Sequence, residues 1–292
     1  MKKKVLKLHW WRSKNFGDNL NAYIFSKCFN IEVRYSNTWG ANAIGIGSIF
    51  DRCLLQIRDI IPFVLSKIIL FYPPIYVFST GTVGILQNYA QKGRFLKSVI
   101  LKRKLKFVAL RGEKTKAEIE KHFNIKLDNT VLGDFGLLAN KLIDEPIEKI
   151  YDIGICPHYG QKEHPIIKKM LEEIPNSVFL DTEEDLMVFL RKLAQCKTVV
   201  STGMHPLIAA DSLNIPNQWA TLYGIEKDVT RFKIPDYYSA LGLYEQMPVD
   251  LRKTKITPES IIQNYKVQKQ KVIEVQNNLL NAISKALDEI FK

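Results

Sequence analysis

The sequence predicts an α/β protein in which two Rossmann-like domains face each other across a cleft. The first observation is that short apolar segments alternate with amphipathic segments along most of the 292 residues, a pattern typical of parallel sheets covered by helices. The second is that the alternation stops at 142–149, a polar stretch with a proline, and then begins again. We therefore expect an N-terminal domain over 1–146 and a C-terminal domain over 147–292.

The first half contains apolar segments of strand length, each bounded by polar or glycine-containing loops. The expected strands are 4–10, 43–49, 75–78, 107–110 and 131–132. A helix is expected at 20–29, capped by Asp18 or Asn19, because a short polar side chain can accept from the free N–H groups of a first helical turn. A charged helix is expected at 113–122.

The second half repeats the pattern. The expected strands are 152–156, 178–180 and 198–201, and the expected helices are 165–174, 183–195 and 205–213. Beyond them, 258–291 predicts one long amphipathic helix that closes back on the body of the protein. Thr257 is its expected N-cap, and Pro258 suits the first helical position.

Composition and charge narrow the class of protein. With 46% hydrophobic and 25% charged residues, the chain is unlike a disordered or fibrous protein. Residues 1–146 carry 24 basic and 11 acidic side chains, whereas 147–292 carry 18 and 19. The excess in the first half favours an anionic partner, although a solvated lysine-rich surface is the alternative. Four separated cysteines and no signal peptide predict reduced thiols in a cytoplasmic protein.

The segment 54–72 interrupts the α/β pattern. It is strongly apolar but includes Arg58, Asp59, Pro62 and Lys67, so it does not fit a membrane-spanning helix. Two readings stay open. One is a helix lying in the membrane interface at the inner face of the plasma membrane, and the other is a core helix beneath the sheet.

Several predicted strands end in residues suited to chemistry on an anion. His158 and His205 can exchange protons near neutral pH, and Arg111 can bind a carboxylate or phosphate through two hydrogen bonds. Ser201 and Thr202 precede the helix that begins at His205, where free N–H groups favour an anion. Together they predict acid–base chemistry on a small anionic substrate.

Other motifs are absent from the sequence. It contains no phosphate-binding P-loop, no dinucleotide-binding glycine pattern after the first strand, and no GxSxG elbow. It has no HExxH motif or tight His/Cys cluster, so no metal site is expected. Basic and aromatic residues are not interleaved as in RNA-binding modules, so no nucleic acid is expected as a partner.

Seven segments, taken in order, resemble the polysaccharide pyruvyl transferase family, and within it the ketal pyruvyltransferases of bacterial exopolysaccharide and capsule assembly. They are NFGDNLN (15–21), IGIGSIF (44–50), FVALRGEKT (107–115), LGDFGLL (132–138), IGICPHY (153–159), STGMHPLIAADSLNIPNQW (201–219) and FKIPDYY (232–238). The resemblance implies a glycosyltransferase-B-like fold. It also implies pyruvate transfer from phosphoenolpyruvate to a sugar of a surface polysaccharide or its lipid-linked repeat unit, forming a ketal without a cofactor.

The resemblance gives the strand-end residues expected roles. His205 is the expected acid, and His158 or Asp18 the expected base. Arg111, Ser201, Thr202 and Lys233 are expected to bind the donor. The residues expected at an acceptor or structural site are Asn15, Asn19 and Asp134.

Two departures from the family pattern stand out. Gly203 occupies a position where some branches of the family carry an arginine, and the stretch between Ser48 and Phe78 is longer than usual. We interpret the latter as an insertion, containing 54–72, for docking to the membrane that holds a lipid-linked acceptor.

Two other functions are alternatives to pyruvate transfer. One is a nucleotide-sugar-dependent glycosyltransferase of the same architecture, and the other is a non-catalytic protein that binds an anionic surface.

Overall fold

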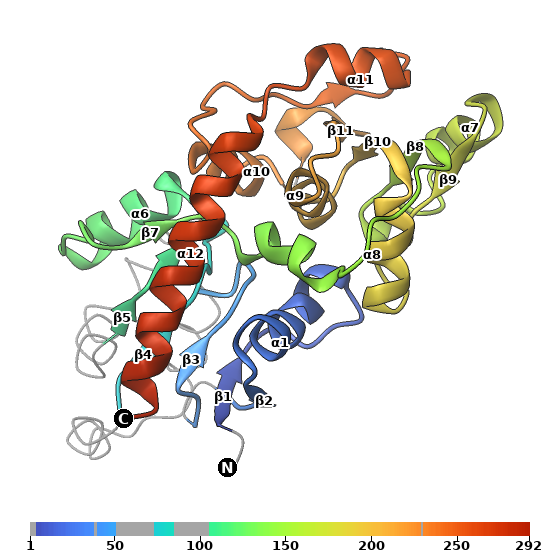
Figure 1. Cartoon of the computed structure of the whole chain (residues 1–292). Helices are drawn as coiled ribbons and strands as arrows, with labels where there is room; N and C mark the ends of the chain where they lie inside the picture. The colour runs from blue at the N-terminus through green and yellow to red at the C-terminus, as the bar shows by residue number, and fades with distance from the viewer. Residues whose placement is uncertain (1–3, 38–39, 51–72, 85–104, 229) are drawn as a thin grey trace.

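In the part of the chain that the structure describes, two five-stranded sheets are each entirely parallel (Figure 1). The computed structural model describes residues 4–37, 40–50, 73–84, 105–228 and 230–292. The expected α/β class with parallel sheets is confirmed. The finer expectation of two Rossmann-like domains divided near residue 146 stays a prediction.

The first sheet has the strand order β2-β1-β3-β4-β5. Its strands are β1 (Val5–His9), β2 (Glu32–Tyr35), β3 (Ala43–Ile44), β4 (Ile75–Val77) and β5 (Leu105–Phe107). Two further strands, β6 (Ala109–Leu110) and β7 (Val131–Leu132), pair with each other, and single bridges connect Gly47 to Thr80 and Thr80 to Leu110. The expected segment 107–110 is therefore divided between β5 and β6.

Helix α1 (Phe16–Phe29) begins earlier than its sequence suggests. Its N-cap is Asn15, whose side chain accepts from the Gly17 N–H at 3.0 Å. Asp18, an expected cap, instead lies in the first turn, where its negative charge suits the helix dipole. The helix thus begins immediately after the polar loop that follows β1.

The second sheet has the order β12-β11-β10-β8-β9. Its strands are β8 (Tyr151–Cys156), β9 (Ser177–Phe179), β10 (Cys196–Ser201), β11 (Asn217–Thr221) and β12 (Val249–Asp250). The accompanying helices are α6 (Glu113–Phe123) after β6, and α7 (Pro165–Glu173), α8 (Leu186–Ala194), α9 (Met204–Ser212) and α10 (Lys233–Ser239) in the second half. The sequence expectations omitted β2, β11, β12 and α10.

One hydrophobic cluster joins the two halves. It contains Leu8 and Phe25 from the first half together with Leu190 and Val199 from the second. The 3₁₀ helix η2 (Phe135–Leu142) lies between α1 and α9 and contacts both. Burying apolar surface of both sheets in one cluster favours a fixed arrangement of the halves.

The expected long helix over 258–291 is wrong in one respect: it is two helices, α11 (Pro258–Asn264) and α12 (Lys269–Ile290). Thr257 caps α11 as expected. The chain is extended at Tyr265, whose hydroxyl donates to the buried Asp211 carboxylate at 2.8 Å. Binding this hydroxyl in the interior favours the break.

Helix α12 extends from the second half onto the first (Figure 1). Gln276 donates to the Leu137 carbonyl of η2 at 2.6 Å. Near the end of α12, Glu289 accepts from Lys106 of β5 at 2.6 Å and from the Tyr76 hydroxyl of β4 at 3.2 Å. The last helix therefore packs on the first sheet.

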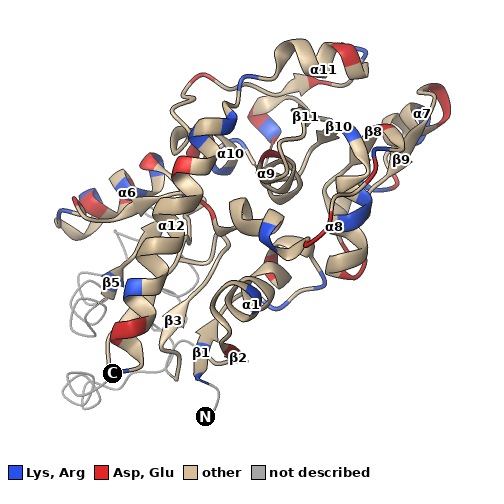
Figure 2. Cartoon of the chain, viewed as in Figure 1, with Lys and Arg blue, Asp and Glu red and all other residues tan. Residues whose placement is uncertain are grey.

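The charge excess of the first half falls mostly outside the described residues. Residues 1–3, 51–72 and 85–104 carry 11 basic and 2 acidic side chains, which is nine of the thirteen excess charges. Figure 2 shows basic and acidic residues mixed along α6 and α12. The segment 54–72 also lies outside the described residues, and no helix within the described ranges is long and apolar enough to cross a membrane.

Candidate active site

A pocket of about 330 Å³ lies where the carboxyl ends of the strands of both sheets meet. The loops after β1 and β3 line it from the first sheet, and the loops after β8, β9 and β10 line it from the second. This is the edge of a parallel sheet at which ligands usually bind. Among the residues expected from sequence, Asn15, Asp18, His158, His205 and Lys233 line this pocket.

The start of helix α9 forms part of the pocket wall. Gly203 is its N-cap and makes no side-chain cap hydrogen bond, and Gly203, Met204, His205 and Pro206 all line the pocket. The first N–H groups of a helix carry partial positive charge and favour an anion. The wall is therefore suited to a phosphate or carboxylate.

Ser201 and Thr202 hold this helix start in place from behind. The Ser201 hydroxyl donates to the Cys156 carbonyl at 2.7 Å and accepts from the Gly203 N–H at 3.0 Å. Thr202 accepts from the His158 N–H at 2.8 Å and donates to Gln161 at 2.5 Å. Both side chains are buried and neither lines the pocket. In this structure both side chains support the loops, and direct binding of the donor by them stays a prediction.

His205 lies against the start of α1. A Cβ atom added to Gly17 would lie 1.9 Å from the imidazole Nδ1, so only glycine leaves room for the ring. Its Nε2 is shielded from solvent and has no hydrogen-bond partner among the described residues. Burial, together with the nearby charges of Lys233 and Arg111, lowers the pKa of His205 to about 3. The imidazole is therefore neutral near pH 7.

His158 and Lys233 lie on the second-sheet side of the pocket. The His158 Nδ1 accepts from the Gly160 N–H at 3.3 Å. Burial and then the positive charge of Lys233 lower the pKa of His158, although Asp228 opposes the shift. Lys233 is the first residue of α10 and influences both imidazoles electrostatically. Two neutral imidazoles therefore lie beside one ammonium group.

Asp18 and Asn15 reach the pocket from α1. The Asp18 carboxylate accepts from the Ser13 hydroxyl at 2.5 Å, and Ser13 also lines the pocket. Asn15 donates to the Thr182 hydroxyl at 3.4 Å, and the Phe16 N–H donates to the Thr182 carbonyl at 2.7 Å. These contacts attach α1 to the loop after β9. Asn19 lies apart, in a separate shallow hollow.

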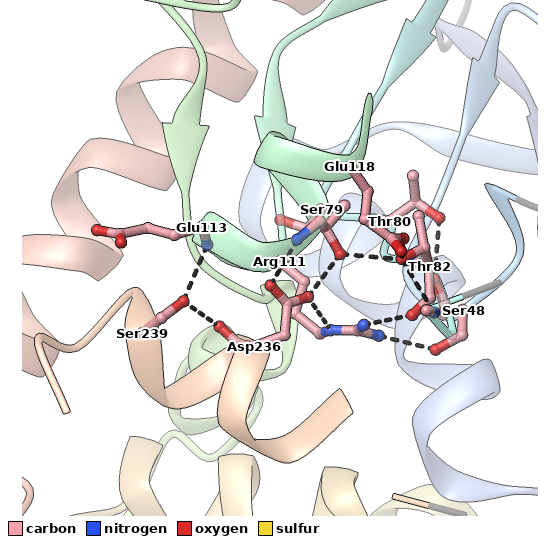
Figure 3. A network of polar contacts seen from close by, with 12 residues as sticks. Ser48, Ser79, Thr80, Thr82, Arg111, Glu113, Glu118, Asp236 and Ser239 are labelled. Atoms are coloured by element: carbon pink, nitrogen blue, oxygen red, sulfur yellow. Dashed lines mark hydrogen bonds and ion pairs between the residues drawn. The ribbon is translucent and has the colours of Figure 1, made fainter. Parts of the chain in front are cut away.

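Arg111 does not line the pocket. Its fully buried guanidinium donates to Asp236 at 2.8 Å, to the Ser48 hydroxyl at 2.7 Å and to the Thr82 carbonyl at 2.6 Å (Figure 3). A Cβ on Gly81 would lie 2.2 Å from its Cζ. In this structure Arg111 thus holds protein groups, Ser48 of the pocket among them, and its direct binding of the donor stays a prediction.

Asp134 does not line the pocket either. It is fully buried and caps η2, accepting from the Gly136 N–H at 2.8 Å, while its Oδ2 has no partner among the described residues. Burial raises its pKa to about 6. Of the two readings expected for it, the structural one fits this position.

Other pocket residues were not singled out from sequence. Trp11 and Ser48 follow strands of the first sheet, and Tyr159 and Glu183 follow strands of the second. A position shortly after an expected strand was the available signal for Trp11 and Tyr159. Ser48 lay within the expected strand 43–49, and Glu183 lay at the start of the expected helix 183–195. Within the described ranges, no group of three His, Cys, Asp or Glu side chains is arranged to hold a metal ion.

Comparison with known proteins identifies the family. The model of the polysaccharide pyruvyl transferase family matches residues 15–217. The chain belongs to this family. Six of the seven segments quoted above lie wholly or largely within the match, whereas FKIPDYY (232–238), which carries Lys233 and Asp236, follows it.

Two relatives of this pyruvyl transferase family member match different lengths of its chain. An uncharacterized protein of Acanthamoeba polyphaga mimivirus is 33% identical over 126 residues, which cover 42% of this chain and 44% of that protein. The succinoglycan biosynthesis protein ExoV of Rhizobium meliloti is 22% identical over 253 residues, covering 85% of this chain and 69% of ExoV. An uncharacterized Klebsiella pneumoniae protein of known structure aligns with a TM-score of 0.44 and 12% identity, over 82% of this chain and 91% of its own.

Proposed function

We propose that this protein transfers pyruvate from phosphoenolpyruvate to two hydroxyls of a sugar, forming a pyruvate ketal on a bacterial exopolysaccharide or its lipid-linked repeat unit. The observation that carries the proposal is the pocket itself. There the start of α9 and Lys233, both suited to an anion, lie beside His158 and His205. Membership of the polysaccharide pyruvyl transferase family supports pyruvate as the transferred group.

The donor is held by charge and by N–H groups. Phosphoenolpyruvate carries a phosphate and a carboxylate, and the pocket offers the N-terminus of α9 and the Lys233 ammonium. Ser48 adds a hydroxyl whose position is fixed by Arg111. Groups prepositioned in this way stabilise the negative charge that develops as phosphate departs.

The reaction balances without a cofactor or a metal. A proton adds to the methylene carbon of phosphoenolpyruvate, converting it to a methyl group and leaving a cationic centre at C2. One sugar hydroxyl bonds to C2 and loses its proton, and the bond from C2 to the phosphate oxygen breaks. The second hydroxyl then closes the ring and its proton leaves, so the products are the ketal and inorganic phosphate.

His205 is our candidate for the acid, on the condition that its imidazole becomes protonated when phosphoenolpyruvate binds. Its pKa of about 3 means that the resting enzyme holds it neutral. The negative charge of phosphoenolpyruvate placed beside it favours the imidazolium and raises that pKa. His158, whose pKa is also lowered, and Asp18 are available as bases for the sugar hydroxyls.

The acceptor places the enzyme at a membrane surface. We propose that the protein works in the cytoplasm and meets a lipid-linked oligosaccharide at the inner face of the plasma membrane. The apolar stretch 54–72, with its basic residues, is our candidate for that contact.

The deciding experiment measures phosphate release from phosphoenolpyruvate, with and without lipid-linked oligosaccharide extracted from the source organism. We expect acceptor-dependent release by the wild type. We also expect loss of release in the His205→Ala variant, whose phosphoenolpyruvate binding and melting temperature are followed in parallel. Failure of the wild type to bind phosphoenolpyruvate at millimolar concentration would overturn the proposal. Binding of a nucleoside diphosphate instead would point to a nucleotide-sugar glycosyltransferase.

A further inference from the structure

The pocket has a deep part and a rim of different chemistry. The deep part is formed by buried residues at the start of α9 and after β3, including Gly203, Met204 and Gly47. The rim contains Trp11 and Tyr159, whose side chains are exposed to 46% and 53%. An exposed tryptophan and tyrosine at the mouth of a polar pocket are not explained by phosphoenolpyruvate, which is small and charged.

The two aromatic rings come from opposite sides of the pocket. Trp11 follows β1 of the first sheet, and Tyr159 follows β8 of the second. The Tyr159 ring packs on the His158 imidazole with 4.2 Å between centroids. A rigid aromatic ring offers a large apolar face at a low cost in conformational entropy.

Polar groups lie at the same rim. Ser13 and Glu183 are exposed pocket residues, and Glu183 is held by Lys162 at 2.5 Å. Asp18, half-buried, lies beside Ser13 between the rim and the deep part. A pyranose ring matches this combination, because its C–H groups form an apolar face while its hydroxyls project from the edge as donors and acceptors.

We propose that Trp11 and Tyr159 form a stacking subsite that binds a pyranose ring of the acceptor and directs its hydroxyls toward Asp18 and His158. The direction of the hydroxyls rests on the proposed function, whereas the binding of a pyranose does not. The aromatic rim binds the acceptor sugar, and the deep part binds the donor.

Binding is tested with simple probes. Methyl β-D-glucopyranoside and methyl β-D-galactopyranoside are examined by saturation-transfer NMR at millimolar concentration, with acyclic mannitol as the non-pyranose control. We expect at least one pyranoside to bind the wild type and the Trp11→Phe/Tyr159→Phe variant, which keeps both rings. We expect binding to disappear in Trp11→Ala/Tyr159→Ala. Equal binding by this last variant, or no pyranoside binding by the wild type, overturns the inference.

The same variants separate acceptor from donor in turnover. Loss of either ring should raise the KM for the lipid-linked acceptor about tenfold, the scale of one aromatic contact, with the KM for phosphoenolpyruvate unchanged. Tyr244→Ala is the matched control, since Tyr244 is 60% exposed but lies outside the pocket. A rise in the phosphoenolpyruvate KM with an unchanged acceptor KM overturns the subsite. Absence of phosphoenolpyruvate binding in the wild type overturns the proposed function. The pyranose subsite is then decided by the pyranoside binding experiment.

Discussion

Arg111 and Asp236 form a fully buried ion pair, with Arg111 Nε 2.8 Å from Asp236 Oδ2. The pair joins the end of β6 to helix α10, and Asp236 also accepts from the N–H and the hydroxyl of Thr115. Lys233 lies one helical turn before Asp236, and Ser48 is bonded to the other side of the guanidinium. Arg111 thus connects the pocket residue Ser48 to Asp236 of α10, the helix that begins with Lys233 (Figure 3).

Breaking this pair should be costly. We expect Asp236→Ala to lower the free energy of unfolding by about 3–5 kcal/mol, because the guanidinium is left buried without its partner. Urea denaturation measures the effect. Asp144→Ala is the control, since the exposed Lys27–Asp144 pair should contribute less than about 1 kcal/mol. Equal losses in the two variants would contradict the assignment.

The contact between Gly133 and α12 offers a test of packing. Gly133 has a φ of +149°, and a Cβ there would lie 2.6 Å from Val275 Cγ1. We expect Gly133→Ala to lower the melting temperature well below that of Gly242→Ala. Gly242 also has a positive φ, of +75°, but has no atom within 4 Å of an added Cβ. Overpacking typically costs about 1–3 kcal/mol.

Adding Val275→Ala should restore part of the stability lost in Gly133→Ala, because it removes the methyl group that the new Cβ meets. Because Val275→Ala removes buried side-chain atoms by itself, the recovery is read from a double-mutant cycle with both single variants. Additive losses in that cycle would assign the Gly133→Ala loss to backbone strain or to the Leu279 contact.

The protonation of His205 can be followed by NMR. Because its pKa is lowered to about 3, its imidazole signals should not titrate over about pH 5 to 8 in the free protein. Phosphoenolpyruvate should move the titration upward. His205→Gln assigns the signal. Ordinary titration near pH 6.5 in the free protein would show that the ring is solvated.

The same lowered pKa affects stability. Neutral His205 contributes stability above its unfolded pKa of about 6.5, and that contribution is lost as the pH falls toward 3. His205→Gln should therefore lose less stability than the wild type over this acidic range, as measured by thermal unfolding.

Gly17 tests whether the position of His205 matters for turnover. A methyl group at residue 17 would occupy the space of the imidazole. We expect Gly17→Ala to reduce turnover on the order of 10²-fold, the scale of losing one transition-state contact, while phosphoenolpyruvate binding through Lys233 persists. Wild-type turnover by this variant would remove His205 from the mechanism.

The sequence predicted those strands and helix starts whose signals lie in adjacent residues. Strand β8 before His158 could be recognised because a buried strand is a short run of apolar residues. The start of α11 could be recognised because its cap, Thr257, and the proline at its first position are neighbours in sequence. The strands β11 and β12 and the break at Tyr265 were missed. The break accompanies a hydrogen bond to Asp211, 54 positions away in sequence, which no local window contains.

The candidate site, like the fold, was predicted only where the signal lies in adjacent residues. A position after a strand was enough to select Asp18, His158 and His205. It could not distinguish a side chain that faces the pocket from one that faces inward, as Arg111 and Ser201 do. That distinction depends on what the second half of the chain places against the first, and Asp236 is the partner that draws Arg111 inward.

The path of α12 bears on how the protein is made. Its final turns bond β4 and β5 through Glu289, so one flank of the first sheet is completed by a residue that follows Lys106 by 183 positions in the chain. Synthesis proceeds at about 5–20 residues per second, and during that time Tyr76 and Lys106 lack their native partner. The early half of the nascent chain is therefore incompletely covered until α12 has been synthesised.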